Sequence, residues 1–482
     1  MTEQNNTPTI NTRMSRRDVL KLGGVIGLGA GLTGVAGAGW IQGKSVDTYS
    51  GWESHEGKTY FNRGPFQVEK PNYKVFRSEI TRIEGLDAPS DRHNLIKQLG
   101  LDKKDGLLQA SGPLKDYYVR NPDKFTKDKI IIEEINPRRK EVEKKIGKKF
   151  ALAHAWDQSW VAVKPGIPQK PEVSDWEGVR KPAYKLKSPQ KTAELIKKMA
   201  QSFGAPLVGI TKLNPAWVYA TAAGSRGYKA GEPISIPEWW EFAIVIGVPH
   251  EWDAMLANPT YGGEDDAISR SNIAAARLAH FIKSLGYPAR IHGGSSLRSE
   301  VVMPPLMVDA GLGEQGRLSL VVTPEFGPNI RPAVITTNIP MQPDKPIDLK
   351  MKEFCRHCKL CAEICPSKAI SFDDYPQNIR GRGVEGWCID LESCLSYRQS
   401  VPSTQRCRLC ITACPWSRKG NWVHNVTKQI IPRDSTGVVA KSLTWAQKTF
   451  YEFPEASRFA DPAWGSYRQA PWYFRAEDFL EL

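Results

Sequence analysis

The most regular hydrophobic pattern lies in the middle of the chain. Ser188 suits the N-cap of a helix, and apolar residues then recur at helical spacing up to Gly204. A second apolar stripe of the same period predicts another helix over residues 267–285. Short, nearly continuous apolar runs predict strands at 206–210, 242–248, 289–292, 317–323 and 332–338. Because helices and strands alternate, residues 188–348 are predicted to form an α/β (α+β) core.

The segments that flank this core are less periodic. Residues 39–187 combine Gly, Pro, aromatic and charged positions, and they predict an irregular wrapping region with one surface helix near 137–148. Residues 421–482 are rich in Trp, Pro and Phe and predict a tail that packs back over the core. A chain of 482 residues is long enough for two or three domains, which fits this division.

The first 38 residues have the pattern of an export signal. Arg16 and Arg17 stand in a twin-arginine motif, an uncharged stretch follows over 22–38, and Ala36-Gly37-Ala38 resembles a cleavage site. The twin-arginine route carries folded proteins, as a protein loaded with cofactors in the cytoplasm requires. We therefore expect residues 1–38 to be removed and the mature chain to lie at the outer face of the cytoplasmic membrane.

The formal net charge of +14 changes this picture little. Such a charge is compatible with nucleic acid or an acidic membrane surface as a partner. However, the basic residues concentrate in segments that also contain Glu and Asp, so a solvated surface is the better interpretation, and no nucleic-acid partner is predicted.

The strongest chemical signal lies in residues 349–420, which hold all nine cysteines of the chain. The first four follow the pattern C-x2-C-x2-C-x3-C-P, the spacing of a bacterial ferredoxin [4Fe–4S] motif. A second group ends in C-x2-C-x3-C-P, but its first ligand, Cys394, stands 13 residues before Cys407. The segment is therefore predicted to be a ferredoxin-like module with two clusters.

The fourth cysteine of a ferredoxin run normally ligates the other cluster of the pair. One [4Fe–4S] cluster is therefore assigned to Cys355, Cys358, Cys361 and Cys414. The other cluster is assigned to Cys365, Cys394, Cys407 and Cys410. Structural zinc and disulfides are the alternatives, but three cysteines within seven residues are not the usual zinc spacing. Cys388 belongs to neither motif and is predicted to be a plain buried thiol.

Together with the signal and the cysteines, several short segments resemble the catalytic subunit of respiratory reductive dehalogenases. These segments are 207–210, 212–214, 217–219, 280–287, 310–313, 323–331 and 343–348. The resemblance spans about residues 200–420. It implies a nitroreductase-like cobalamin-binding core, a corrinoid held base-off without a His ligand, and two [4Fe–4S] clusters.

The same resemblance implies the reaction and the partners. The substrate would be a small chlorinated hydrocarbon, reduced with cob(I)alamin and with electrons that arrive through the clusters. The partners would be a small hydrophobic membrane-anchor protein, an upstream respiratory electron donor and a second copy of the chain in a homodimer. Tyr219 and the 310–313 turn, with Gly311 and Gly313, would lie close to the corrinoid.

The resemblance also implies a proton-donating Tyr beside the cobalt and a nearby cation. Arg331 occupies the position of the cation. The position of the Tyr falls on Ile268, which cannot transfer a proton. Tyr261, His292 and Arg270 are the alternative donors, chosen because they lie nearby in the sequence.

A reaction that needs no proton at carbon is the other explanation. Vicinal dihaloelimination of a chlorinated alkane, such as 1,2-dichloropropane, gives an alkene and consumes two electrons and no proton at carbon. This reaction is the first hypothesis, and hydrogenolytic dehalogenation of chloroethenes is its alternative. Two other classes remain: an epoxyqueuosine-reductase-like tRNA enzyme, which the export signal disfavours, and a non-catalytic iron–sulfur electron-transfer subunit, which would contain no cobalt.

Overall fold

The structure is a computed structural model that describes residues 66–71, 83–98, 101, 111–162, 183–223, 228–261, 263–293, 300–378, 385–402, 407–417, 428–434, 436–450, 453–461, 465–467 and 470–482. The predicted signal segment 1–38 lies outside the described residues. Within them, no helix is both long and apolar enough to cross a membrane.

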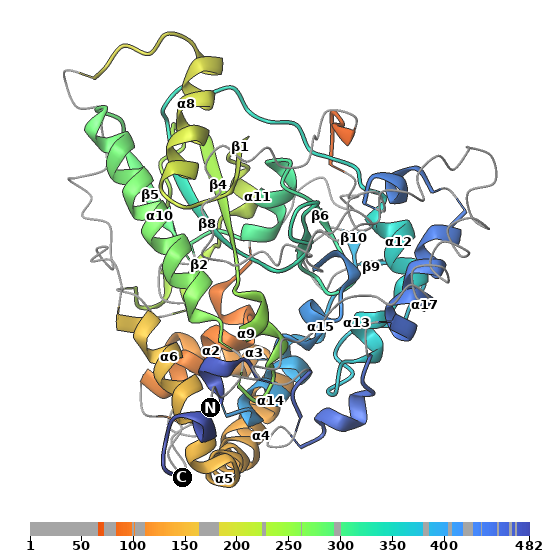
Figure 1. Cartoon of the computed structure of the whole chain (residues 1–482). Helices are drawn as coiled ribbons and strands as arrows, with labels where there is room; N and C mark the ends of the chain where they lie inside the picture. Colours follow the sequence, from red (N-terminus) through yellow and green to blue (C-terminus); the bar gives the residue numbers. More distant parts are fainter. Residues whose placement is uncertain are drawn as a thin grey trace, which may run out of the picture.

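A four-stranded sheet forms the centre of the fold (Figure 1). Its order is β1 (Leu207–Lys212), β4 (Phe242–Pro249), β8 (Ile330–Thr337) and β5 (Ala289–His292). Every neighbouring pair is antiparallel. An antiparallel sheet with helices belongs to the α+β class, so of the two classes predicted for the core the structure has α+β and not α/β. The strand pattern could not decide this, because apolar runs are alike in buried strands of both kinds.

Two predicted helices cover one face of this sheet. α8 (Pro189–Ser202) begins as expected, because the Ser188 hydroxyl accepts a hydrogen bond from the Lys191 amide at 3.2 Å. α10 (Asp265–Ser284) lies beside it (Figure 1). Ile196 and Leu278 from these helices pack with Ile244 and Ile335 of the sheet in one buried cluster. Both helix predictions are confirmed, and so are the strands at β1, β4, β5 and β8.

Shorter elements cover the opposite face. There α11 (Met303–Asp309) places Leu306 against Val245 and Val334 in a second cluster. The predicted strand at 317–323 is wrong in length, because Ser319 has a φ of 59° and turns the chain. Only a two-residue ladder remains, between β6 (Glu314–Gln315) and β7 (Val321–Val322). The remaining elements are η6 (Pro215–Trp217), β2 (Thr221–Ala223), β3 (Ala230–Pro233) and α9 (Trp252–Leu256).

The region before the core is more helical than its sequence indicates. A nearly continuous helical arm, residues 113–162, contains α3 (Pro113–Arg120), α4 (Pro122–Ile130), η4 (Ile131–Ile135), α5 (Asn136–Ile146), η5 (Gly147–Phe150) and α6 (Ala151–Ala162). The surface helix predicted near 137–148 corresponds to α5. The description of this region as irregular is wrong for the arm, because Pro113 and Pro122 begin helices and do not interrupt them. η2 (Gly85–Asp87) and α2 (Pro89–Gln98) precede the arm.

The cysteine-rich region follows the core and lies on one side of the sheet (Figure 1). Its elements are α12 (Met351–Cys358), α13 (Leu360–Glu363), β9 (Gln377–Asn378), β10 (Glu385–Gly386), α14 (Leu391–Ser400), α15 (Leu409–Thr412) and η7 (Pro415–Ser417). The last elements are η8 (Ile431–Arg433), α17 (Val438–Phe450), η9 (Ala456–Phe459), η10 (Trp472–Phe474) and η11 (Ala476–Asp478).

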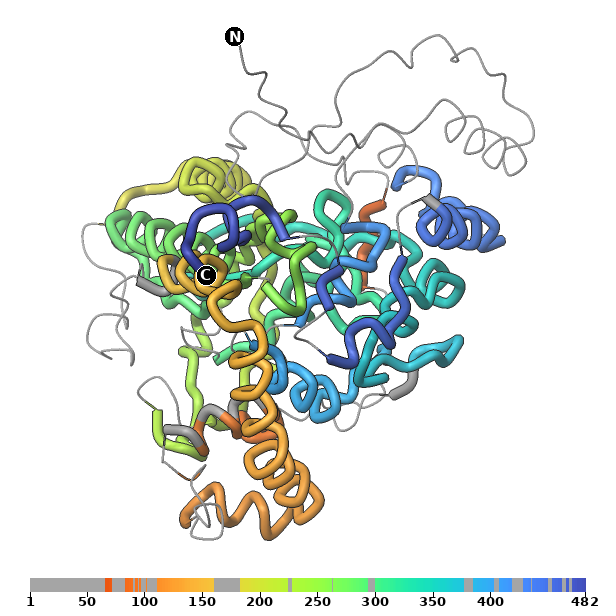
Figure 2. The backbone as a smooth tube through the Cα atoms, turned by 60° about the horizontal axis from the view of Figure 1, so that its bottom comes forward, coloured from red at the N-terminus to blue at the C-terminus, as the bar shows by residue number. Residues whose placement is uncertain are grey.

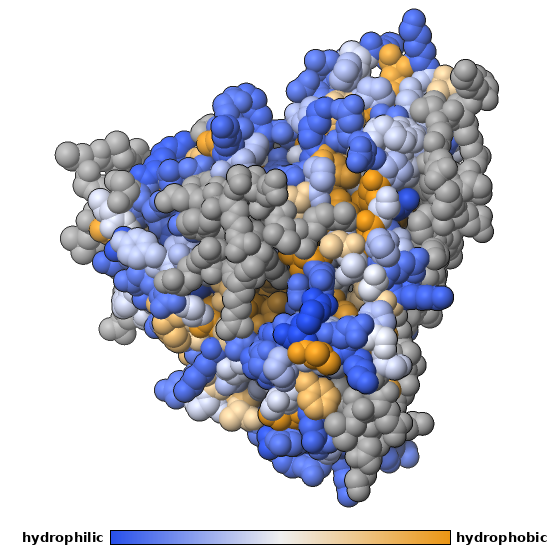
Figure 3. Space-filling model, turned by 180° about the vertical axis from the view of Figure 1, so that it is seen from behind, coloured by the Kyte–Doolittle hydropathy of each residue, from blue (hydrophilic) through white to orange (hydrophobic). Residues whose placement is uncertain are grey.

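The C-terminal segment does pack back onto earlier elements. α17 packs against α12, and η10 packs against α6. The Tyr467 amide donates a hydrogen bond to the Asn258 carbonyl at 2.8 Å. Figure 2 shows the end of the chain beside the helical arm. Figure 3 shows that apolar side chains also gather in the middle of the face seen from behind, so exposed hydrophobic surface is not confined to single residues.

A buried ionic network joins the N-terminal helices to the cysteine-rich region. Arg92, which is fully buried, donates to Asp128 at 2.7 Å and to Glu392 of α14 at 3.3 Å. Lys127 contacts the other oxygen of Glu392 at 3.1 Å. Glu392 lies two residues before Cys394, so the arm helps to fix the helix that carries a predicted ligand.

We therefore expect Arg92→Ala to lower the free energy of unfolding by about 3–5 kcal/mol, because the substitution leaves a buried carboxylate without its cation. Urea unfolding of the cofactor-loaded protein measures the change. Arg120→Ala is the matched control: its ion pair with Glu84 is 59% and 38% exposed, and such pairs contribute at most about 1 kcal/mol. Equal effects of the two substitutions would contradict this role of Arg92.

Candidate iron–sulfur and arginine site

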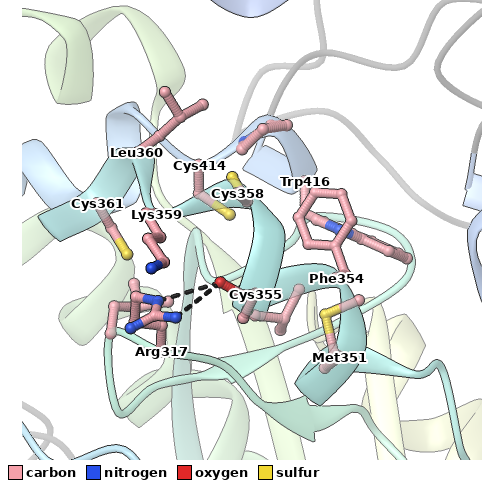
Figure 4. A pocket seen from close by; sticks show the side chains of 13 residues that line it. Arg317, Met351, Phe354, Cys355, Cys358, Lys359, Leu360, Cys361, Cys414 and Trp416 are labelled. Carbon is pink, nitrogen blue, oxygen red and sulfur yellow. Dashed lines mark hydrogen bonds between the residues drawn. The ribbon is translucent and has the colours of Figure 1, made fainter. Parts of the chain in front are cut away.

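The first predicted set of cysteines surrounds one pocket (Figure 4). Its lining includes Cys355, Cys358, Cys361 and Cys414, together with apolar side chains such as Phe354 and Trp416. Three of these thiols come from α12 and α13, and Cys414 follows α15. The structure therefore brings the fourth cysteine of the second motif to the first three cysteines of the first motif.

The local backbone explains how three cysteines reach one volume. Lys359 has a φ of 54°, so the chain turns between Cys358, the last residue of α12, and Leu360, the first of α13. Arg317 braces this turn from the core by donating from Nε and Nη2 to the Cys355 carbonyl at 3.1 and 3.0 Å. Among the described residues no three His, Cys, Asp or Glu side chains converge closely enough for a single metal ion; the four thiols are instead spread round a pocket.

The second predicted set also lies together. Burial, together with the nearby Cys394 and Cys365 thiols, raises the pKa of the Cys407 thiol to about 12. The same causes, burial first, raise the pKa of Cys410. Cys365 of the first motif thus lies among the cysteines of the second. Cys388 is only partly buried, so the prediction of a buried thiol is wrong in its burial.

The chemistry of both sets fits iron–sulfur clusters. Burial raises the pKa of Cys355 to about 12 as well, so bare thiolates are strongly disfavoured in these apolar surroundings. Iron ions would supply the positive charge that four buried thiolates need. The eight cysteines are therefore suited to hold two cubanes, with one ligand exchanged between the motifs.

Arg331 lies at the start of β8 and is held by a buried carboxylate. Its Nη1 donates to Glu264 Oε1 at 2.6 Å. Arg408, between Cys407 and Cys410, forms an ion pair with the other carboxylate oxygen, Oε2. Burial alone would raise the pKa of Glu264, but Arg408, Arg331 and Arg398 together hold it well below its usual value. Glu264 is therefore an anion that bridges Arg331 and the second cysteine motif.

Ile268 follows Glu264 by one turn of α10. Its amide donates to the Glu264 carbonyl at 3.4 Å, and its side chain is buried. Glu264 is the N-cap residue of α10, so Ile268 lies in the first turn of the helix that begins at the carboxylate holding Arg331. Its place beside the reacting site stays a prediction.

The alternative proton donors lie in different surroundings. Arg270 is engaged with Asp266 Oδ2 and with the Pro249 carbonyl, both at 2.7 Å. Tyr261 packs with Phe150, 6.3 Å between ring centroids, in clusters made by the arm and the C-terminal segment. Burial raises the pKa of Tyr261, which makes its phenolate less accessible.

His292 lies on the other face of the sheet from Arg331. Its Nε2 is 2.9 Å from the Thr336 hydroxyl, and its Nδ1 is 3.0 Å from Glu300. Thr336 and Arg331 are five residues apart on β8, and side chains alternate between faces along a strand. His292 therefore does not lie beside Arg331, although it is close in the sequence to the predicted position of the proton donor.

The residues predicted to lie near a corrinoid are explained in part by packing. Gly311 has a φ of 70°, and a Cβ atom there would lie 2.3 Å from the Lys345 carbonyl oxygen. A Cβ atom on Gly313 would lie 2.2 Å from the Val322 carbonyl oxygen. Both positions need glycine for close backbone contact. Tyr219 is half-buried, and its amide donates to the Glu300 carbonyl at 2.9 Å. A contact of any of the three with a corrinoid stays a prediction.

Glu264, Arg398 and Arg408 are not predicted by the sequence pattern. An acidic residue before a helix is favoured by the helix dipole, so Glu264 gives no sign of a functional role in the sequence. The signal that could have found the arginines is their position: Arg408 stands directly after Cys407, and Arg398 follows Cys394 by four residues. Only the tertiary fold shows that Arg408 pairs with the same carboxylate as Arg331 and that Arg398 acts on it electrostatically.

The cysteine region matches a known protein family. Residues 354–417 match the family described as "4Fe-4S dicluster domain". The match includes both motifs and all eight predicted ligands.

The chain is also similar to curated reductive dehalogenases. It is 30% identical over 276 residues to a tetrachloroethene reductive dehalogenase of Sulfurospirillum multivorans. This alignment covers 50% of this chain and 54% of that protein. It is 29% identical over 304 residues to a tetrachloroethene reductive dehalogenase of Desulfitobacterium hafniense, covering 53% of each chain. The homologues of this chain are reductive dehalogenases. They are oxidoreductases that act on carbon–halogen bonds, and the chain spans about half the length of these curated relatives.

Solved reductive dehalogenases share the fold. The catabolic reductive dehalogenase NpRdhA, in complex with 3-bromo-4-hydroxybenzoic acid, superimposes with a TM-score of 0.58 at 24% identity, over 83% of this chain and 50% of that one. A second solved reductive dehalogenase, whose structure suggests a mechanism for B12-dependent dehalogenation, superimposes with a TM-score of 0.58 at 23% identity. The match covers 84% of this chain and 51% of that one. An epoxyqueuosine reductase of Bacillus cereus is also similar, 30% identical over 129 residues, but over only 24% of this chain and 29% of that protein.

Proposed function

We propose that this chain is the catalytic subunit of a respiratory reductive dehalogenase. It would remove halogen from a small chlorinated hydrocarbon with a corrinoid and two [4Fe–4S] clusters. The observation that carries the proposal is the junction of Arg331, Glu264 and Arg408. It links the predicted active-site cation directly to the loop of the second cysteine set.

Buried polar atoms in the cysteine-rich region support a bound corrinoid, whose ring carries many amide side chains. Within the described residues, both amide atoms of Gln399, the indole nitrogen of Trp416 and the hydroxyl of Ser417 are buried and have no hydrogen-bond partner. Such groups are normally satisfied. Gln399 follows Arg398 on α14, and Trp416 lines the first cysteine pocket. These residues would hold the corrinoid, base-off, against a nitroreductase-like core.

The protein's own contribution would be electrostatic and steric. A reduced corrinoid supplies the strongly reducing cobalt centre, and the protein orients the substrate and excludes water. Arg331, fixed by Glu264, would stabilise the negative charge that develops on a departing halide. Ile268 offers an apolar wall and no proton.

Among dehalogenation reactions, vicinal dihaloelimination suits this site best. Two carbon–halogen bonds break, one carbon–carbon double bond forms, two electrons enter and two halide ions leave. Hydrogenolysis of a chloroethene breaks one carbon–halogen bond, forms a carbon–hydrogen bond and consumes two electrons and one proton. The first reaction needs no donor at position 268, so a vicinal dichloroalkane such as 1,2-dichloropropane is the proposed substrate.

Product analysis in heavy water tests the reaction type. The corrinoid-loaded enzyme, kept anaerobic with a chemical reductant, receives a vicinal dichloroalkane or a chloroethene. We expect an alkene without deuterium from the dichloroalkane. Deuterated products that have lost a single chlorine, formed from chloroethenes while the dichloroalkane stays unchanged, would overturn the dihaloelimination proposal.

A single substitution offers a sharper test of Ile268. We expect Ile268→Tyr to raise the fraction of deuterated, singly dechlorinated product several-fold, because it places a phenol one turn from Glu264. Ile268→Phe is the matched control, since it adds the same ring without the hydroxyl. Identical product ratios for both variants would remove Ile268 from the explanation of the reaction.

Location and partners are part of the same proposal. The twin-arginine motif supports export to the outer face of the cytoplasmic membrane. A small hydrophobic anchor protein would hold the chain there, and an upstream respiratory donor would deliver electrons to the clusters. A homodimer is proposed from resemblance alone.

A further inference from the structure

Glu264 joins the core, through Arg331, to the second cysteine motif, through Arg408. One carboxylate oxygen accepts from Arg331 at 2.6 Å, and the other pairs with Arg408 of the second cysteine motif. We infer that Glu264 is a positioning residue that couples the active-site cation to the second cluster. This inference rests on the proposed function, since it assumes that Arg331 faces the reacting site.

The geometry makes Glu264 the common anchor of both arginines. Its side chain is only 5% exposed, so water does not screen the contacts strongly. Arg331 lies near the start of the interior strand β8, opposite Val248 of β4, and Arg408 immediately precedes α15. Each guanidinium belongs to a rigid element, and the carboxylate between them fixes their separation.

The charges around Glu264 act on the second cysteine set. Arg408 directly follows Cys407, and Arg398 follows Cys394 by four residues in α14, so both cations lie close to ligands of this set. These cations therefore favour negative charge on the sulfur ligands. Glu264 offsets part of their effect. Removing its charge leaves the arginines less compensated and favours the more negative, reduced state of a cluster held there.

A redox titration of the holoenzyme tests the coupling without any turnover. We expect Glu264→Gln to shift the midpoint potential of the second cluster upward, with a much smaller shift of the first. The electron paramagnetic resonance signal lost in a Cys407→Ala variant identifies the second cluster. Glu300→Gln is the matched control, because it removes a buried carboxylate on the opposite face of the sheet and should leave both potentials in place.

Two further variants separate charge from position. Glu264→Asp keeps the charge but is too short to reach both arginines, so the potential should stay near the wild-type value while kcat falls. Arg408→Gln should shift the second potential downward and serves if Glu264→Gln does not fold. Unchanged potentials in both Glu264→Gln and Arg408→Gln would overturn the inference. The proposed function fails separately, by absence of clusters or of dehalogenation in the unaltered enzyme.

Discussion

Cys414→Ala should remove half of the iron from the protein and abolish one of two cluster signals. The reason is that Cys414 lies in the pocket of Cys355, Cys358 and Cys361, although it belongs to the second motif. We expect a cubane left with three of its four thiolates to be lost from this apolar pocket. Iron analysis and electron paramagnetic resonance of the reduced protein measure the loss.

The predicted exchange of Cys365 and Cys414 between the two motifs can be tested by comparing variants. Cys358→Ala should abolish the same signal as Cys414→Ala, and Cys407→Ala should abolish the same signal as Cys365→Ala. If each motif held its own cluster, Cys365→Ala would instead match Cys358→Ala, and the assignment would be wrong. Cys388→Ala is the matched control and should keep the full iron content.

Arg331→Ala should reduce kcat/KM for dehalogenation by roughly 10²–10³-fold, because one fixed donor to a developing negative charge is removed. Its corrinoid and iron contents should stay normal. Arg331→Lys should recover part of the loss, since it keeps the charge but not the planar guanidinium that donates to Glu264.

Arg277→Ala is the control for this substitution. Arg277 is also an arginine that packs at α10, but its side chain is exposed. Its guanidinium lies over the ring of Phe203, in the second half of the helix and away from Glu264. Its replacement should leave dehalogenation unchanged. A loss in Arg331→Ala no larger than that in Arg277→Ala would assign Arg331 to structure and not to the reaction.

The sheet and its helices were predictable because their local signals agree. Ser188 caps α8 as expected, and the apolar run of β4 is buried along its whole length. Strand direction was not predictable, because antiparallel pairing of β1, β4, β8 and β5 depends on connections and not on residue type. Apart from α5, the helical arm was not predicted, because its charged, Pro-containing sequence gives little apolar periodicity.

The candidate site divides in the same way. The cysteine spacing predicts two ligand sets, and the structure places those same two sets together. Arg331 could be named from its segment, but the bridge through Glu264 could not. Residues 264, 331 and 408 lie far apart in the sequence, and only packing of α10 against β8 and the cysteine loops brings them together. His292 shows the opposite error, since a neighbour in sequence lies on the wrong face of the sheet.

Corrinoid-dependent halide release tests the central proposal most directly. The anaerobic chain, loaded with both clusters, would receive a chemical reductant and a vicinal dichloroalkane, with and without reconstituted corrinoid. The account predicts two chloride ions for each alkene formed, and only in the sample with corrinoid. A chain that carries both clusters but binds no corrinoid, or binds it and releases no chloride from dichloroalkanes or chloroethenes, would contradict the account and favour an electron-transfer role.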